Sequence, residues 1–277
     1  MTGARQFFEE TFRPAKLLLD VYRLLENEGI QTEGDWIHKL RALVGAGEEE
    51  ELLLIWNGVF LGLVMEAAAV HKAALKPEVL KNLLRQAVVS ACTAMESYLQ
   101  VLLDQELTGI IRIRGLEMYP KGDKEVVEYF RDFNVGLEGA LRLIAGDSDP
   151  YAALARNLLG YFKYKNLGSD KAVKTAGVML GLDAPWKRIA QHLERDEVDL
   201  VNGIRTTFKR RNDIVHRGDR ELGQETAPRQ DISYQWTKQA LESIENVCLT
   251  LGELVGKRLK ELKGLHQQRE DRSPNEH

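Results

Sequence analysis

The sequence predicts an all-α protein, and three observations carry that prediction. Leu, Ala, Glu, Lys and Arg dominate the chain, and all of them are good helix formers. Only 7 prolines interrupt its 277 residues, and the glycine- and proline-punctuated segments typical of sheets are largely absent. Apolar residues make up 44% of the chain, which is enough for a sizeable core and argues against global disorder.

The first 75 residues are expected to form a helical extension. One helix is predicted over residues 4–28, ended by Gly29, and a second over residues 35–45. The glutamates at 48–51 are expected to open a third, strongly apolar helix, because acidic residues in a first turn complement the helix dipole. No motif within residues 1–75 indicates what this extension does.

The longest apolar helix is expected over residues 77–108. Pro77 marks its start, since proline is favoured in the first turn of a helix. The helix is apolar nearly all round, which predicts a place in the centre of a bundle. Cys92 within it and the distant Cys248 have no Cys-x-x-Cys partner, so both are expected to be buried and reduced, as in a cytoplasmic protein.

The remaining patterns indicate further helices of the same domain. They cover four stretches: residues 123–145, the residues after Pro150, short pieces within 161–185, and residues 197–217. Gly218 ends the last of these, and a polar loop leads into a long final helix that ends near Lys263. Residues 76–263 are therefore predicted to form one helical domain, followed by a flexible tail over residues 264–277.

Several classes of protein are not expected because of what the chain lacks. The longest uncharged stretch, residues 52–65, has 14 residues, whereas a membrane span needs roughly 20. The first residues show no signal peptide, so a cytoplasmic protein is expected. Neither a His-Glu-x-x-His motif nor a Cys/His cluster is present, so no metal site and no cofactor are expected. The net charge of −4 means that contact with nucleic acid would need a local basic patch.

Residues 205–220 supply such a patch. They contain six cationic residues and two acidic ones, a net charge of +4 within 16 residues of an acidic chain. A phosphate-binding surface shows this local contrast. Cations also gather near helix C-termini because the helix dipole favours them, which is the simpler interpretation.

Within this segment, Arg211-Asn212-Asp213-Ile214-Val215-His216 resembles the R-x4-6-H motif of the HEPN superfamily, in the form with a polar residue directly after the arginine. In that superfamily the motif lies near the end of a late helix and another long helix follows, as expected here. Glu96 resembles the acidic residue of an earlier hydrophobic helix, especially as seen in the RiboL-PSP-HEPN branch. The resemblance covers residues 77–262.

The resemblance implies an all-α, HEPN-type helical bundle with additional N-terminal helices, and it implies a metal-independent endoribonuclease. Proteins of this superfamily dimerise, so that two copies of the motif line one cleft. A homodimer with a composite active site and an RNA substrate are therefore expected. Such proteins often act as toxins or in antiphage defence, which implies an antitoxin or another defence protein as a further partner.

The chemistry of this reaction fits the residues of the motif. RNA is cleaved without metal when its 2′-hydroxyl attacks the adjacent phosphate, leaving a 2′,3′-cyclic phosphate. Histidine is the side chain suited to moving protons near neutral pH, and His216 is assigned that role. Arg211 is assigned to the charge of the transition state. Asn212 lies four residues before His216 on the same helical face, and it is assigned either to orienting the imidazole or to binding a phosphate oxygen.

Further residues are expected to support this site. Glu96 would hold Arg211 through a charge-assisted pair, with an ordinary ion pair to another cation as the equal alternative. Asp213 would hold Arg211 locally or, as the safer interpretation, face solvent. The candidates for binding substrate phosphates are Lys209, Arg210 and Arg217.

Two rival interpretations stay open because the motif is short. Arg211 and His216 are five residues apart, roughly 140° around a helix, so they do not share a face. The protein could also be a non-catalytic HEPN-type module that binds RNA, a nucleotide or a partner protein, which would explain the fold and the basic patch without catalysis. It could also be an unrelated helical interaction protein in which both residues are incidental.

Overall fold

Two compact units make up the chain, and four long helices contribute residues to both. The computed structural model describes residues 2–27, 52–56, 61–65, 77–115, 124–129, 131–145, 149–164, 169–220 and 228–272. The first unit contains residues 1–12, 91–212 and 242–277, and the second contains residues 13–90 and 213–241. The division expected at residue 76 stays a prediction.

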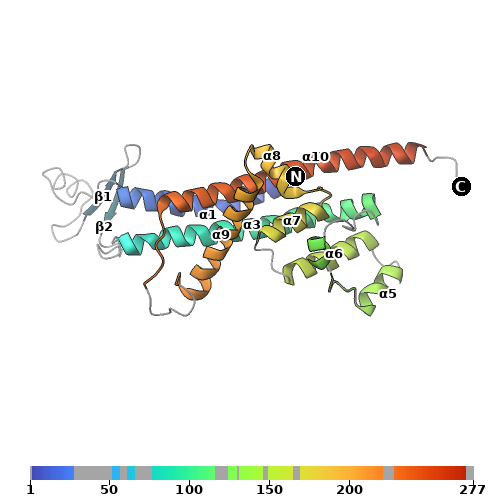
Figure 1. Ribbon diagram of the computed structural model, residues 1–277, viewed down its shortest axis with the longest axis horizontal. Coiled ribbons are helices and arrows are strands. Elements are labelled where there is room, and N and C mark those ends of the chain that lie inside the picture. Colours follow the sequence, from blue (N-terminus) through green and yellow to red (C-terminus); the bar gives the residue numbers. More distant parts are fainter. Residues whose placement is uncertain are drawn as a thin grey trace. The chain divides into compact units, whose positions relative to one another are not determined.

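Helices account for nearly all of the described residues (Figure 1), which confirms the all-α prediction for this part of the chain apart from one pair of short strands. Four of them supply residues to both units: α1 (Thr2–Asn27), α3 (Pro77–Arg114), α9 (Glu197–Arg217) and α10 (Tyr234–Arg272). Five shorter ones belong to the first unit: α4 (Lys124–Tyr129), α5 (Leu137–Ala145), α6 (Pro150–Tyr164), α7 (Asp170–Met179) and α8 (Pro185–Leu193).

A β-hairpin in the second unit replaces the helix that was expected after the glutamates at 48–51. Strands β1 (Leu52–Trp56) and β2 (Leu61–Met65) pair antiparallel, with Leu52 opposite Met65 and Trp56 opposite Leu61. The helix expectation is therefore wrong for these residues. The sequence between the two apolar runs contains Asn57-Gly58, a pair that favours tight hairpin turns over a helix. The helix expected over residues 35–45 lies outside the described residues.

The core of the first unit is built on α3. The ring of Phe8 lies 5.1 Å from that of Tyr98 and is stacked on that of Phe12, also at 5.1 Å. α3 buries residues over more than half of its circumference: Ala91, Ala94, Met95, Tyr98, Leu99, Leu102, Leu103, Leu107, Ile110 and Ile111. Such burial is expected of a helix that is apolar nearly all round. Cys92 and Cys248 are both free and buried, as predicted.

The helical pattern expected over residues 123–145 corresponds to two helices in the structure. The chain forms α4, leaves the helical conformation over residues 131–136 and becomes helical again as α5. Gly136 stands directly before α5, and glycine weakens a helix because it loses the most backbone freedom on folding. The helical pattern predicted for these residues is therefore confirmed as two separate helices.

α7 and α8 approach each other closely at Gly177. A Cβ atom at this position would lie 2.6 Å from Cγ of Pro185, so the approach needs a residue without a side chain. Pro185 is itself the first residue of α8, where its missing N–H costs no hydrogen bond. The short helices predicted within residues 161–185 are thus confirmed by the end of α6 and by α7.

The core of the second unit is smaller. The rings of Tyr22 and Tyr234 stack with centroids 6.4 Å apart, and the Tyr22 hydroxyl donates a hydrogen bond of 2.5 Å to Glu26. Besides Tyr22, the buried apolar residues of this unit, among those described, are Ala15, Leu19, Leu80, Leu84, Ala87, Val88, Ile214, Ile232, Ala240 and Leu241. Burial raises the pKa of Tyr22 well above its usual value, so this hydroxyl keeps its proton.

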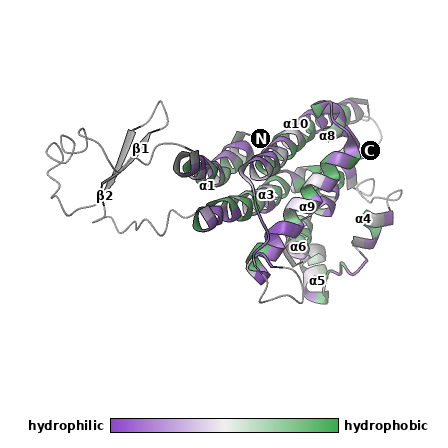
Figure 2. Ribbon diagram, turned by 60° about the vertical axis from the view of Figure 1, so that its left-hand side comes forward, coloured by the Kyte–Doolittle hydropathy of each residue, from purple (hydrophilic) through white to green (hydrophobic). Residues whose placement is uncertain are grey.

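The last helix, α10, extends to Arg272 and so runs past the end that was expected near Lys263. A single glycine, Gly264, does not end it, because the following residues are mostly good helix formers. The helices of both units carry hydrophobic and hydrophilic residues on different sides (Figure 2). Among the residues that the structure describes, no helix is both long and apolar enough to cross a membrane.

Candidate functional site

The motif residues lie on α9, and the sequence predicts the bounds of this helix correctly. The acidic residues Glu197 and Asp199 occupy its first turn, and the Asp199 N–H donates to the carboxylate of Asp196 at 3.0 Å. Gly218 ends it with a φ of 58°, a left-handed conformation that glycine adopts without strain. Arg211, Asn212 and His216 therefore all stand in the last two turns of one continuous helix.

In the first unit, the structure brings Arg211 and Glu96 together as an ion pair between α9 and α3. The second terminal nitrogen of the Arg211 guanidinium donates to the side-chain oxygen of Asn212 at 3.1 Å. The same guanidinium lies over the ring of Phe208, 5.4 Å from its centroid. The side chains of Arg211 and Glu96 are only 14% and 21% exposed, so three contacts hold the arginine head in one place.

The electrostatics of this cluster depend on Arg211. Burial raises the pKa of the Glu96 carboxyl above its ordinary value, and the Arg211 guanidinium opposes that rise. Burial likewise raises the pKa of the neighbouring Cys92 thiol to about 12, again with Arg211 opposing the rise, so this thiol keeps its proton. Arg211 is thus the fixed positive charge of a half-buried environment that disfavours anions.

The end of α9 that belongs to the second unit carries His216, whose side chain is exposed. Asn212 is exposed as well, and its spacing of four residues places it on the same face of α9 as His216. Arg211 lies on a different face, as the helical spacing predicts. The histidine is therefore accessible to a substrate, whereas the arginine is mostly covered.

Asp213 neither holds Arg211 nor faces solvent, so the safer interpretation of this residue is wrong. It is 8% exposed, and its carboxylate accepts a hydrogen bond of 2.9 Å from Arg217, one helical turn later. The Arg217 side chain, 42% exposed, covers the carboxylate while its own charge is partly neutralised. Of the other cations expected to bind phosphate, Lys209 is exposed and Arg210 is half-buried.

A buried ion pair in the second unit, which the sequence does not reveal, holds the chain directly after α9. Nε of Arg85 donates to the carboxylate of Asp219 at 2.6 Å, and the two side chains are 5% and 0% exposed. The Asp219 N–H donates to the carbonyl of Asp213 at 2.9 Å, and its own carbonyl accepts from the Gln230 N–H at 2.8 Å. Arg85 also donates to the Gln230 carbonyl at 2.9 Å, so the same arginine holds Asp219 by its side chain and Gln230 by its main chain.

Comparisons with models of protein families, with curated proteins and with solved structures found no match. The resemblance to the HEPN superfamily thus stays a prediction that rests on the residues of the motif and on Glu96. Within the described part of the chain, no group of three His, Cys, Asp or Glu side chains is placed to hold a metal ion.

The ion pair between Arg211 and Glu96 should appear as a coupling energy in a double-mutant cycle. Urea unfolding of the wild type, Arg211→Met, Glu96→Gln and the double variant is expected to give a coupling of about 1–3 kcal/mol at neutral pH. Because burial raises the pKa of Glu96, the coupling should begin to fall at a pH above the ordinary glutamate value as the solution is acidified. Free energies that add to within about 0.5 kcal/mol would show that the pair contributes nothing.

Proposed function

We propose that the protein is a metal-independent endoribonuclease of the HEPN type and that α9 carries its active-site residues. One observation supports this most directly: Arg211 is fixed by Glu96, while His216 is exposed on the same helix five residues later. A buried histidine would have no access to a substrate, and a mobile arginine would have to be ordered during the reaction.

The proposed reaction removes one proton from the attacking 2′-hydroxyl and delivers one proton to the leaving 5′-oxygen. The 2′-hydroxyl of the RNA loses its proton to a base and attacks the adjacent phosphorus. The bond from phosphorus to the 5′-oxygen then breaks, and an acid protonates the leaving oxygen. His216 serves as one of these two groups, and His216 of a second copy of the chain serves as the other. The products are a 2′,3′-cyclic phosphate and a 5′-hydroxyl.

Arg211 and Asn212 have different parts in this proposal. Arg211 supplies a fixed positive charge in a half-buried environment, where its field acts on the phosphorane more strongly than it would in water. Glu96 and Phe208 keep that charge in place. Asn212 shares its face with His216 and can donate its amide N–H to a phosphate oxygen, since its oxygen already accepts from Arg211.

The chemistry of the product ends tests the proposal. Purified protein is incubated with single-stranded RNA in excess EDTA, and the fragments are analysed for their termini. We expect cleavage to continue in EDTA and to leave 5′ ends that a kinase phosphorylates without prior phosphatase treatment. Loss of cleavage in EDTA, or fragments with 5′-phosphates, would contradict the mechanism.

A second candidate function is a non-catalytic module that binds RNA. The observation that favours it is the engagement of Arg211 with Glu96, which leaves its side chain only 14% exposed. Such a module would bind RNA in the same assay and leave it intact. The role as a toxin or in antiphage defence stays a prediction from the resemblance.

A further inference from the structure

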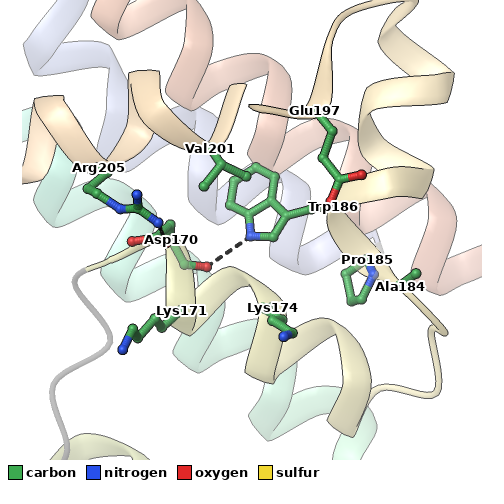
Figure 3. A pocket seen from close by; sticks show the side chains of 9 residues that line it. All are labelled: Asp170, Lys171, Lys174, Ala184, Pro185, Trp186, Glu197, Val201 and Arg205. Atoms are coloured by element: carbon green, nitrogen blue, oxygen red, sulfur yellow. Dashed lines mark hydrogen bonds and ion pairs between the residues drawn. The ribbon is translucent and has the colours of Figure 1, made fainter. Parts of the chain in front are cut away.

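A pocket in the first unit lies outside the motif and was not predicted. Side chains from α7, α8 and α9 line it (Figure 3), and its volume of about 370 Å³ lies at the small end of the range in which ligand pockets occur. Its cations are Lys171 and Lys174 from α7 and Arg205 from α9. All of these residues belong to the same unit.

The walls of this pocket are held by a chain of specific contacts. Nε1 of Trp186 donates to the carbonyl of Asp170 at 3.1 Å, and the Asp170 carboxylate, largely buried, pairs with Arg205 at 2.8 Å. The close approach of Gly177 on α7 to Pro185, which lines the pocket from α8, fixes these two helices against each other. The Arg205 side chain stays 59% exposed although one of its nitrogens is anchored. A ligand therefore meets a preformed site whose arginine is already oriented.

Side chains of opposite charge line two sides of the pocket. In Figure 3, Lys171 and Arg205 lie on one side and Glu197 on the other, with the apolar side chains of Trp186 and Val201 between them. The cations suit an anionic group such as a phosphate. The Glu197 carboxylate accepts hydrogen bonds only, so it suits the amino group of a base or the hydroxyl of a sugar. A nucleotide offers both kinds of group, with a flat ring between them.

The register of α9 relates this pocket to the motif. Arg205, Lys209 and the motif residue Asn212 follow one another at intervals of four and three residues within the first unit, so they share one face of the helix. All three side chains are exposed. A polyanion that occupies the pocket would therefore have Lys209 as its next cation along this face.

We propose that this pocket binds a nucleotide of single-stranded RNA at a position away from the bond that is cut. Lys171, Lys174 and Arg205 contact its phosphate, and Glu197 accepts a hydrogen bond from its base or sugar. The assignment names the substrate class of the proposed endoribonuclease and rests on that function. A bound nucleotide explains why Glu197 lies beside three cations, whereas a surface that binds any anion would have no use for a carboxylate there.

The binding experiment uses the double variant Lys171→Gln/Lys174→Gln in the His216→Ala background, so that the RNA stays intact. The anisotropy of a fluorescein-labelled single-stranded RNA is measured across a range of salt concentrations. We expect affinity to fall about tenfold and the slope of log K against log salt to fall by about one. The matched control is Lys257→Gln/Lys260→Gln, an exposed pair with the same spacing on α10 of the same unit, which should bind as the parent does. Equal affinities of the two double variants would overturn the proposal.

A second variant separates nucleotide recognition from attraction of any anion. Glu197→Ala removes a negative charge beside the three cations, so a site for unspecific anions would bind RNA more tightly after the change. We expect the opposite, a several-fold loss of affinity, because the hydrogen-bond acceptor is lost. Tighter binding by Glu197→Ala would overturn the assignment of a nucleotide and leave an acidic peptide as the better candidate.

Cleavage assays with His216 present keep the two proposals apart. The variant Lys171→Gln/Lys174→Gln is expected to raise KM and to leave kcat unchanged, because it acts on binding away from the reacting phosphate. If the wild type cleaves RNA and the two double variants have the same KM, the pocket assignment fails and the nuclease stands. If RNA binding depends on the pocket but nothing is cleaved, the nuclease fails and the pocket stands.

Discussion

Replacing His216 by alanine is expected to lower the rate of RNA cleavage by about 10²–10⁴-fold, the usual contribution of a positioned acid or base. The proposed mechanism needs one proton removed and one delivered. His216 is exposed, and it lies on the same face of α9 as Asn212. Its side chain is exposed, so the free energy of unfolding should stay within about 0.5 kcal/mol of the wild-type value. Rates at saturating RNA and urea unfolding curves measure the two effects separately.

His192→Ala is the control for this variant. His192 is another exposed histidine near the end of a helix, paired with Glu253 at 3.4 Å, and it lies outside the motif. Its replacement should leave cleavage unchanged. Equal cleavage by wild type and His216→Ala would identify a contaminating nuclease and remove His216 from the mechanism. Equal losses of cleavage in both variants would show that the loss is not specific to the histidine of the motif.

Replacing Asp219 by asparagine is expected to cost about 3–5 kcal/mol of the free energy of unfolding. The carboxylate is fully buried and pairs with Arg85, which is itself 5% exposed. Without its partner, the guanidinium would be a buried charge that neither water nor another anion compensates. Asparagine tolerates the left-handed φ of 66° at this position, so the loss reports the charge and not backbone strain. Urea unfolding followed by circular dichroism measures it.

Asp231→Asn is the matched control for this stability prediction. Lys81 lies on α3, as Arg85 does, and its Nζ is 2.7 Å from the carboxylate of Asp231. The Asp231 side chain, however, is 78% exposed. Solvent screens such a pair, so the unfolding midpoint should change far less. Arg85→Met/Asp219→Asn should recover part of the loss, because neither charge is then buried alone. Equal unfolding midpoints for Asp219→Asn and Asp231→Asn would contradict the prediction that the buried pair stabilises the fold more than the exposed one.

Helix termini with clear chemical markers were predictable from the sequence. Pro77 and Gly218 mark the start of α3 and the end of α9 where the structure has them, because proline suits a first turn and glycine suits a left-handed residue after the last. The pairing of Arg211 with Glu96 followed from a resemblance and not from local patterns, since the two residues are 115 positions apart. Helical spacing alone indicated that Arg211 and His216 do not share a face.

Features that depend on contacts between distant residues could not be predicted in the same way. Arg85 and Asp219 are 134 positions apart, and Asp170 and Arg205 are 35 apart, so no local pattern connects them. The hairpin over residues 52–65 was missed for another reason. Its short apolar runs fit a buried helix as well as a strand, and the pair Asn57-Gly58 between them is the one local pattern that favours a hairpin.

The contact between Gly177 and Pro185 limits how this protein can change over evolutionary time. A single methyl group at residue 177 would collide with Pro185, which lines the pocket, so this part of the pocket wall cannot change by mutation at residue 177 without damage to the fold. Lys171 and Glu197 stand at the rim and are exposed, so replacing them costs the fold little. Selection can therefore alter what the pocket prefers by exchanging rim residues one at a time, while the scaffold beneath them is inherited unchanged.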